Sequence, residues 1–331
     1  MSADYSEKIL TVKDLEVQFN LRGQVLTAIR GISLDIYKGE SLAIVGESGS
    51  GKSVFTKTFM GMLDKNGKVT KGEILYNGMD LAKFSSEKDW LKIRGKEVAM
   101  VFQDPMTSLN PLKTVGKQIQ EALELHQNLH GRAAREKTIE ILSDVGISEP
   151  ERRYKQYPHE FSGGMRQRAV IATAIACNPN ILICDEPTTA LDVTIQAQII
   201  ELLEQLQKKY RLTIIYITHD LGVVAKVADR IAVMYAGNIV EQGNVFDVFA
   251  APSHPYTRLL MRALPRKTKH EGRLETIDGN VPRITEKKPG CRFANRCPLA
   301  KEICFTENPP VLTVSHDHTF SCHFAEEASK L

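Results

Sequence analysis

The strongest chemical pattern in the chain is a glycine-rich loop with one lysine and one terminal hydroxyl, which fits G-x-x-x-x-G-K-[ST]. It reads Gly46-Glu47-Ser48-Gly49-Ser50-Gly51-Lys52-Ser53. An apolar run precedes it and a helix-like apolar segment, 55–63, follows it, which argues against a chance glycine–serine turn. The glycines let backbone N–H groups converge on phosphate oxygens, and the N-terminus of the following helix attracts an anion. Lys52 would supply positive charge to the β- and γ-phosphates, and Ser53 a hydroxyl for Mg²⁺.

Two adjacent carboxylates, Asp185 and Glu186, follow the apolar run 181–184. Asp185 is placed to hold the water shell of a magnesium ion, and Glu186 to polarise an attacking water. The alternative is that both acids cap the next helix, because acids stabilise a helix N-terminus. Beside a phosphate-binding loop, the catalytic interpretation is favoured.

Polar groups follow four apolar runs that have the character of buried strands. The runs are 41–45, 98–102, 181–184 and 212–218, and they end at the glycine-rich loop, Gln103, Asp185 and His219. Ligands of open α/β sheets bind at the carboxyl ends of the strands, so the four groups are expected to converge. His219 could otherwise cap a helix or lie in the core, and Gln103 alone is nearly uninformative.

These groups need a sheet and helices to position them. Strands are expected within 11–45 and over 72–81, with a turn at Asn77-Gly78, and helices within 115–177 and over 195–210. Apolar strands that alternate with helices predict an α/β fold with a mostly parallel sheet covered on both faces. After about residue 255 the sequence becomes basic and rich in prolines, so we place a domain boundary there. The basic segment from Arg262 to Arg273 is either a solvated linker or a membrane-surface contact.

The composition is that of a soluble globular protein with about two domains: 331 residues, 42% hydrophobic and 25% charged. A net charge of +3 gives little support for nucleic acid as a partner. No run approaches the roughly 18 apolar residues of a spanning helix, and the N-terminus lacks a secretory pattern. We therefore expect a cytosolic chain whose membrane role, if any, comes through partners.

Further motifs resemble those of ABC-transporter ATPases, in the order that this family has them. The matching residues are Phe19, Gln103, the segment Phe161-Ser162-Gly163-Gly164-Met165-Arg166-Gln167-Arg168, the segment Thr188-Thr189-Ala190-Leu191-Asp192, and His219. The signature departs from the family's Leu-Ser-Gly-Gly-Gln at Phe161 and Met165. The resemblance covers about residues 11–250.

The resemblance implies an ABC-type P-loop ATPase core with an antiparallel subdomain and a helical subdomain at about 104–178. It implies ATP and Mg²⁺ as ligands, with Glu186 as general base and His219, Lys52 and Gln103 as further catalytic residues. Ser162, Gly163 and Gly164 would close, in trans, a nucleotide held by the other subunit of a head-to-tail dimer. Phe19 would stack on adenine, and Mg²⁺ would be held by Ser53, Gln103 and Asp185. The other nucleotide contacts would come from Gly46, Glu47, Ser48, Gly49, Ser50, Gly51, Lys52, Ser53, Val54, Gln103 and Asp185.

Four of the six cysteines gather near the end of the chain, as Cys291, Cys297, Cys304 and Cys322. A cytosolic setting disfavours disulfides, so the thiols indicate a zinc site or an iron–sulfur cluster, with His316, His318 and His323 as spare ligands. The alternative is free or unrelated thiols. Cys177 and Cys184 fall in a helix-like and a strand-like segment, so we interpret them as core residues.

The tail resembles the C-terminal domain of oligopeptide/dipeptide importer ATPases. The matches are Ser253-His254-Pro255-Tyr256-Thr257, Gly290-Cys291, Arg296-Cys297-Pro298 and Cys322-His323, with Tyr157-Pro158-His159 and the segment from Gln103 to Pro111 in the core. The resemblance implies domains at 1–255 and 256–331 and an ATPase that powers peptide import from the cytoplasmic face of the bacterial membrane. It implies a second ATPase subunit, as a heterodimer, two membrane permeases and an extracellular peptide-binding protein as partners, and no nucleic acid. Members of this subfamily are reported to carry a four-iron cluster, so [4Fe-4S] is preferred over Zn²⁺.

Three other functions are weighed against peptide import. Nickel or another small solute is an alternative cargo within the same subfamily, because the binding protein and the permeases choose the cargo. A soluble ABC ATPase acting on nucleic acid or ribosomes would usually have two cassettes, a coiled coil or a basic insertion, and none is visible. A module that binds ATP without turnover is disfavoured by Glu186 and His219.

Overall fold

The computed structural model describes residues 4–189, 191–263, 277–282 and 289–328. The chain divides into two compact units, which are described separately. The first contains Tyr37–Ser41 and Phe84–Ile217, together with the beginning of the chain, and the second contains Lys8–Ile36, Leu42–Lys83 and Thr218–Leu331.

The first unit contains three parallel strands in the order β8, β7, β6. Every residue of these strands is buried, as expected for a parallel sheet covered on both faces. Their bounds are β6 (Val98–Val101), β7 (Ile181–Asp185) and β8 (Thr213–Thr218). The three apolar runs predicted from the sequence are thus strands.

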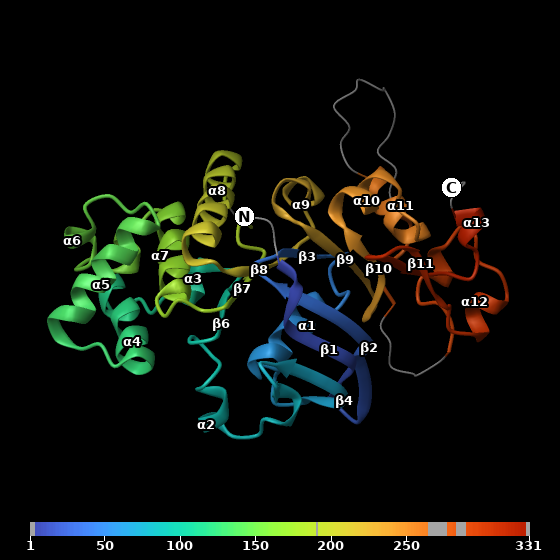
Figure 1. Ribbon diagram of the computed structural model, residues 1–331, viewed down its shortest axis with the longest axis horizontal. Coiled ribbons are helices and arrows are strands. Elements are labelled where there is room, and N and C mark those ends of the chain that lie inside the picture. Colours follow the sequence, from blue (N-terminus) through green and yellow to red (C-terminus); the bar gives the residue numbers. More distant parts are fainter. Residues whose placement is uncertain (1–3, 190, 264–276, 283–288, 329–331) are drawn as a thin grey trace. The chain divides into compact units, whose positions relative to one another are not determined.

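The first unit contains the longest helices of the described residues (Figure 1). The predicted helical segment 115–177 is divided because Asn128, in the left-handed conformation at φ 53°, ends one helix and Ser162 caps the start of another. The elements are α2 (Glu87–Trp90), α3 (Pro105–Ser108), α4 (Val115–Gln127), α5 (Gly131–Asp144), α6 (Pro150–Arg153), the 3₁₀ turn Pro158–Glu160, α7 (Gly163–Ile175) and α8 (Val193–Tyr210).

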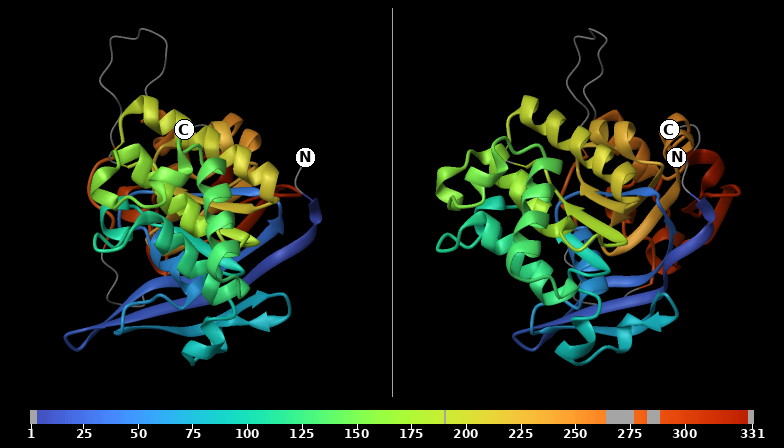
Figure 2. Two further views of the ribbon diagram at one scale, coloured as in Figure 1. Left: turned by 90° about the vertical axis from the view of Figure 1, so that its left-hand side faces the viewer. Right: turned by 60° about the vertical axis from the view of Figure 1, so that its left-hand side comes forward.

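The second unit contains an antiparallel sheet in the order β2, β1, β4, β5, drawn in blue and cyan in Figure 2. Strand β1 pairs with β4 in a register that places Leu10 opposite Tyr76. The turn expected at Asn77-Gly78 joins β4 to β5, and both residues have positive φ, 47° and 78°. The bounds are β1 (Asp4–Leu21), β2 (Gln24–Lys38), β4 (Gly67–Tyr76) and β5 (Met79–Asp80).

The second unit also contains a mixed run of strands in the order β11, β12, β10, β9, β3. Strands β3 and β9 are parallel, and the other pairs are antiparallel. The segment 55–63, expected as one helix, is a short helix followed by a 3₁₀ turn that ends at Gly61, at φ 59°. The elements are β3 (Ser41–Val45), α1 (Lys52–Lys57), 3₁₀ turns Thr58–Met60, Leu81–Lys83 and Ala294–Arg296, α9 (Leu221–Val227), β9 (Arg230–Tyr235), β10 (Asn238–Asn244), α10 (Val245–Ala250), α11 (Pro255–Arg262), α12 (Ile303–Thr306), β11 (Val311–Ser315), β12 (His318–Ser321) and α13 (Ala325–Ala328).

A buried carboxylate, Glu241, joins three parts of the second unit. Its side chain is fully buried on β10, and it accepts hydrogen bonds from the backbone N–H groups of Ser253 (2.7 Å) and His254 (2.9 Å). His318, on β12, contacts the same carboxylate through Nε2 at 2.7 Å. Burial lowers the pKa of His254 to about 4, against the opposing influence of Glu241, so its ring is neutral and Nδ1 accepts from the backbone of Tyr256. Glu241 therefore links β10 to β12 and to the start of α11.

None of the helices in the described part of the chain combines the length and the apolar character needed to cross a membrane.

Replacing Glu241 by leucine should destabilise the second unit, because the variant leaves three donors, two of them buried, without an acceptor. We expect a loss of about 3 kcal/mol and a fall in Tm of roughly 5–10 °C, measured by circular dichroism. Glu241→Gln keeps one carbonyl oxygen as an acceptor, so its free energy of unfolding should fall clearly less than that of the leucine variant.

The matched control is Glu121→Leu, which removes an exposed ion pair with Lys113. Such pairs contribute about 0–1 kcal/mol, so this variant should unfold close to the wild-type temperature. Equal Tm values for the two leucine variants would contradict the proposed link.

Candidate functional site

The glycine-rich loop lies between β3 and α1 in the second unit, as the sequence predicts. Gly46 has φ 151°, and a Cβ at this position would lie 2.2 Å from the backbone oxygen of Met234. Only glycine fits this approach of the loop to β9. Gly51, at φ 102°, is the N-cap residue of α1, and Lys52 is the first residue of that helix.

The ammonium group of Lys52 is held inside its own loop. Nζ donates to the backbone oxygens of Gly46 (2.8 Å) and Glu47 (3.0 Å), and the residue is only 7% exposed. The hydroxyl of Ser50 is also buried and has no hydrogen-bond partner among the described residues. A bound phosphate would offer Lys52 oxygens that carry more negative charge than these carbonyls, so the loop is built to exchange one set of acceptors for the other.

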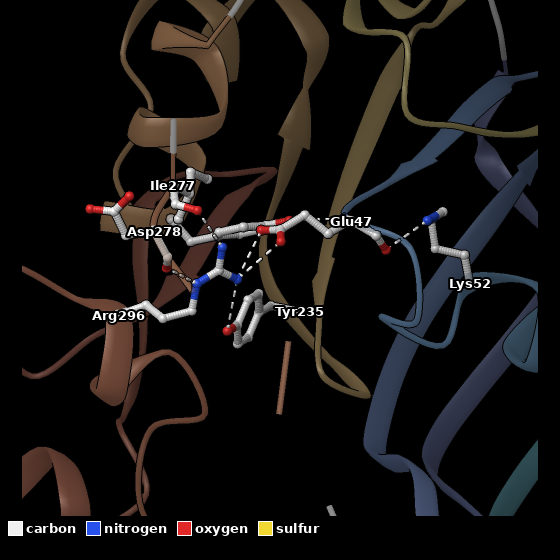
Figure 3. Close-up of polar contacts among 7 residues, drawn as sticks. Glu47, Lys52, Tyr235, Ile277, Asp278 and Arg296 are labelled. Atoms are coloured by element: carbon white, nitrogen blue, oxygen red, sulfur yellow. Dashed lines mark hydrogen bonds and ion pairs between the residues drawn. The ribbon is translucent and has the colours of Figure 1, made fainter. Parts of the chain in front are cut away.

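The side chain of Glu47 forms an ion pair that the sequence does not predict. Nη1 of Arg296 contacts both carboxylate oxygens, at 3.0 and 3.1 Å (Figure 3). The backbone N–H of Glu47 donates to the hydroxyl of Tyr256 at 3.0 Å. Burial lowers the pKa of Arg296, but its hydrogen bonds to Tyr235 and Glu47 more than compensate, so the pKa is raised and the guanidinium stays charged. The loop is thus tied to a residue 249 positions away.

In the first unit, the structure brings Gln103 and Glu186 together. Nε2 of Gln103 donates to the carboxylate of Glu186 at 3.0 Å, and the hydroxyl of Thr189 donates to the same oxygen at 2.9 Å. Glu186 has φ 47°, an uncommon conformation for a residue other than glycine and one that often marks functional sites. Asp185 ends β7 and is 8% exposed. Gln103 follows β6 and Glu186 follows β7, so their contact is expected for two neighbouring parallel strands that end at the same edge of the sheet.

The other two polar strand ends, the glycine-rich loop and His219, belong to the second unit. His219 is exposed directly after β8, and Asp220 caps α9 by accepting from the backbone of Gly222 at 2.8 Å. His219 is therefore neither a core residue nor the cap of that helix. The convergence of all four strand ends stays a prediction.

The remaining motifs lie at element ends or on a strand. Ser162 caps α7 by accepting from the N–H of Met165, and both Ser162 and Gly163 are exposed. Asp192 caps α8 in the same way, and Ala190 of that motif lies outside the described residues. Phe19, on β1, is half-buried opposite Gly67, against which its ring packs. Val54 lies in the first turn of α1.

The four C-terminal cysteines line one small cavity of about 10 Å³, and His323 lines it with them. Burial raises the pKa of the Cys291, Cys297 and Cys322 thiols, that of Cys297 to about 11, and the neighbouring thiols raise them further. Of the other proposed ligands, His316 is exposed beside Asp317, and His318 contacts Glu241. Among the described residues, however, no group of three or more His, Cys, Asp or Glu side chains is arranged to hold a metal ion. Cys177 and Cys184 are buried, as predicted.

Two family models match the chain. The model described as ABC transporter matches residues 29–189, and the model described as oligopeptide/dipeptide transporter, C-terminal region, matches residues 240–304. The oligopeptide transport ATP-binding protein AmiE of Streptococcus pneumoniae is 54% identical over 94% of this chain and 87% of its own length. The dipeptide transport ATP-binding protein DppD of Bacillus subtilis is 50% identical over 98% of this chain and 97% of its own length.

The chain belongs to the ABC-transporter ATP-binding proteins of the oligopeptide/dipeptide group. It is an ATP-hydrolysing transporter subunit, and the predicted α/β ATPase fold is confirmed. The dimeric post-hydrolysis structure of the ATP-binding cassette MJ0796, bound to ADP and Pi, resembles it with a TM-score of 0.64 and 28% identity, over 71% of this chain and 98% of the cassette. The structure of cbiO1 from Clostridium perfringens, described as part of a cbiONQ ABC transporter complex, has a TM-score of 0.64 and 32% identity, over 74% of this chain and 91% of its own.

The sequence motifs of this ABC ATPase did not identify Thr189 as a contact of Glu186, nor Tyr256 and Arg296 as contacts of Glu47. Tyr256 and Arg296 lie within the tail segments that resemble the importer ATPases, but nothing in those segments indicates which residue they meet. Thr189 belongs to a recognised motif, and only the backbone turn at Glu186 brings its hydroxyl to the carboxylate.

Gly46→Ala should weaken ATP binding at least about tenfold, because the added Cβ would overlap the Met234 carbonyl and move the loop. Gly31→Ala is the matched control outside the loop: a Cβ there meets nothing within 4 Å, and the only cost is strain at φ 70°. Calorimetric titration of the purified chain with ATP and Mg²⁺ checks the difference. Equal losses for both variants would show that the approach to Met234 is unimportant.

Proposed function

We propose that this ABC ATPase powers the import of oligopeptides or dipeptides across the bacterial cytoplasmic membrane. The observation that carries the proposal is the combination of a cassette with the C-terminal region of oligopeptide/dipeptide transporters in one chain. Relatives about half identical over nearly the whole chain support it, because they are oligopeptide and dipeptide transport ATP-binding proteins.

The proposed site uses the residues that the sequence analysis selected. Lys52 and the backbone of its loop would bind the β- and γ-phosphates, and Phe19 would stack on adenine. Ser53, Gln103 and Asp185 would hold Mg²⁺, which neutralises phosphate charge when bound. The contact between Gln103 and Glu186 supports a shared role for these two residues.

Glu186 is proposed to accept a proton from the attacking water, with His219 holding water and γ-phosphate in line. Ser162, Gly163 and Gly164 would bind a nucleotide held by a second ATPase subunit. The exposure of Ser162 and Gly163 at the start of α7 supports this arrangement, because their backbone N–H groups are accessible to an anion. The dimeric form of the similar cassette is a further support.

The proposal includes a peripheral location on the cytoplasmic face of the membrane and an assembly with other chains. The partners would be a second ATPase subunit, two permeases and an extracellular peptide-binding protein. The domains would be 1–255, with a helical subdomain at about 104–178, and 256–331.

Glu186→Gln should lower ATP hydrolysis by the assembled transporter at least about 100-fold, because an amide cannot accept the proton of the attacking water. ATP should still bind, so the variant should accumulate as an ATP-bound closed dimer. Phosphate release by the complex in proteoliposomes, and size-exclusion chromatography with ATP, measure the two effects.

Glu201→Gln is the matched control, because Glu201 is an exposed glutamate on α8 and its change is chemically the same. It should hydrolyse ATP and import peptide at the wild-type rate. Hydrolysis at the wild-type rate by Glu186→Gln would overturn the assignment of Glu186 as the base. Hydrolysis that does not respond to peptide, together with import of nickel alone, would overturn the proposal that peptides are the cargo.

We further propose that the C-terminal cysteines hold a [4Fe-4S] cluster, which would supply a redox-active, charge-bearing group. Cys291, Cys297, Cys304 and Cys322 would be the ligands. A single Zn²⁺, with Zn–S bonds of about 2.3 Å, would require the sulfurs to lie about 3.8 Å apart. The four thiols line one cavity, and this shared location supports a common metal group held by all four.

Anaerobically purified protein should contain about four iron and four sulfide ions per chain and absorb near 400 nm. Cys297→Ser should reduce the iron content severalfold, whereas Cys177→Ser, at a buried cysteine outside the cavity, should not. A colourless preparation with one zinc ion per chain would overturn the cluster.

A further inference from the structure

The acidic side chain of Glu47 lies in a loop whose proposed ligand is a polyphosphate. Like charges repel, and the repulsion is strong where water is partly excluded. Glu47 is only 27% exposed, so solvent alone does not screen its charge well. An unpaired carboxylate at this position would oppose the binding of ATP, and the loop therefore needs a nearby cation that the ligand does not displace.

Arg296 provides that cation. Nη1 contacts both oxygens of Glu47 and the hydroxyl of Tyr235 (3.2 Å), and the other two nitrogens donate to backbone oxygens: Nε to Asp278 (2.7 Å) and Nη2 to Ile277 (3.0 Å) (Figure 3). All three guanidinium nitrogens are thus occupied by fixed partners. The Arg296 side chain is 6% exposed, so the ion pair is largely protected from screening by salt.

Aromatic packing fixes the segment that carries Arg296. Phe293 lies three residues earlier, and its ring packs against Tyr235 and Tyr256, with centroid distances of 5.2 and 5.3 Å. These tyrosines also contact the ion pair: the Tyr235 hydroxyl accepts from Arg296, and the Tyr256 hydroxyl accepts from the backbone of Glu47. This one cluster of aromatic rings therefore contacts both Arg296 and Glu47 and fixes their positions relative to each other.

We propose that Arg296 is a positioning residue of the nucleotide site: by neutralising Glu47 and fixing its side chain, it sets the affinity of the phosphate-binding loop for ATP. The inference rests on the proposed use of this loop for ATP phosphates. Arg296 acts through Glu47, and Lys52 remains the lysine that meets the phosphates, because it contacts the opposite, backbone side of Glu47. The C-terminal segment thereby becomes part of the nucleotide-binding machinery.

The test is calorimetric titration of the full-length chain with ATP and Mg²⁺. Arg296→Gln should weaken binding about tenfold, because it leaves the Glu47 carboxylate uncompensated. Adding Glu47→Gln to that variant should restore affinity to within about threefold of wild type, because no charge then needs neutralising. The ATP affinity of Arg296→Lys should lie between those of Arg296→Gln and the double variant, since lysine keeps the charge but cannot make the same set of hydrogen bonds.

The matched control is Lys301→Gln, which removes the same charge from an exposed ion pair with Glu327 in the C-terminal region. It should bind ATP as the wild type does. Rescue by the second substitution separates charge neutralisation from a merely structural role, because a disrupted segment would not be repaired by changing Glu47.

Two results would overturn the inference: wild-type affinity in a folded Arg296→Gln variant, or a double variant that binds as weakly as Arg296→Gln. If Arg296→Gln does not fold, as judged by thermal unfolding, the same comparison is made between Arg296→Lys and Glu47→Gln with Arg296→Lys. A wild-type chain that binds no ATP would instead refute the proposed nucleotide site itself.

Discussion

A phosphate-binding loop must present donors and positive charge at one point without a competing anion, and several features of the second unit meet this requirement. Gly46 lets the backbone curve against Met234, and Lys52 is held ready by two carbonyl groups. Arg296 neutralises Glu47, the one carboxylate within the loop. Curvature and positive charge thus come from the eight-residue loop itself, whereas the compensating charge comes from a residue 249 positions away.

Local features of the site follow from the sequence because the signals are themselves local. The loop between an apolar run and a helix, and the turn at Asn77-Gly78, are found where the sequence predicts them, since backbone preference fixes both. The contact between Gln103 and Glu186 follows from one further step, which is that neighbouring parallel strands end at the same edge. The segment predicted as one helix over 55–63 is instead α1, which ends at Lys57, followed by a 3₁₀ turn that ends at Gly61, at positive φ.

Contacts between distant residues could not be predicted in this way. Glu241 and His318 form a buried pair across 77 positions, and neither residue belongs to a pattern with a characteristic spacing. The left-handed backbone at Glu186 is invisible in the sequence, because only glycine, asparagine and aspartate commonly indicate it. The clustered cysteines did predict a common location, and they line a single cavity, but their spacing in the sequence does not distinguish a zinc site, a cluster and free thiols.

The length of the loop between Glu47 and Arg296 bears on biosynthesis. A ribosome makes these residues in order, so 249 further positions of chain must be added after the carboxylate before its guanidinium partner exists. Local strands and hairpins form long before that moment, because short chain closures are rapid. The nascent chain therefore passes through a stage in which the glycine-rich loop is made but Glu47 still bears an unmatched negative charge, and the proposed gain in nucleotide affinity arises only after Arg296 has been added.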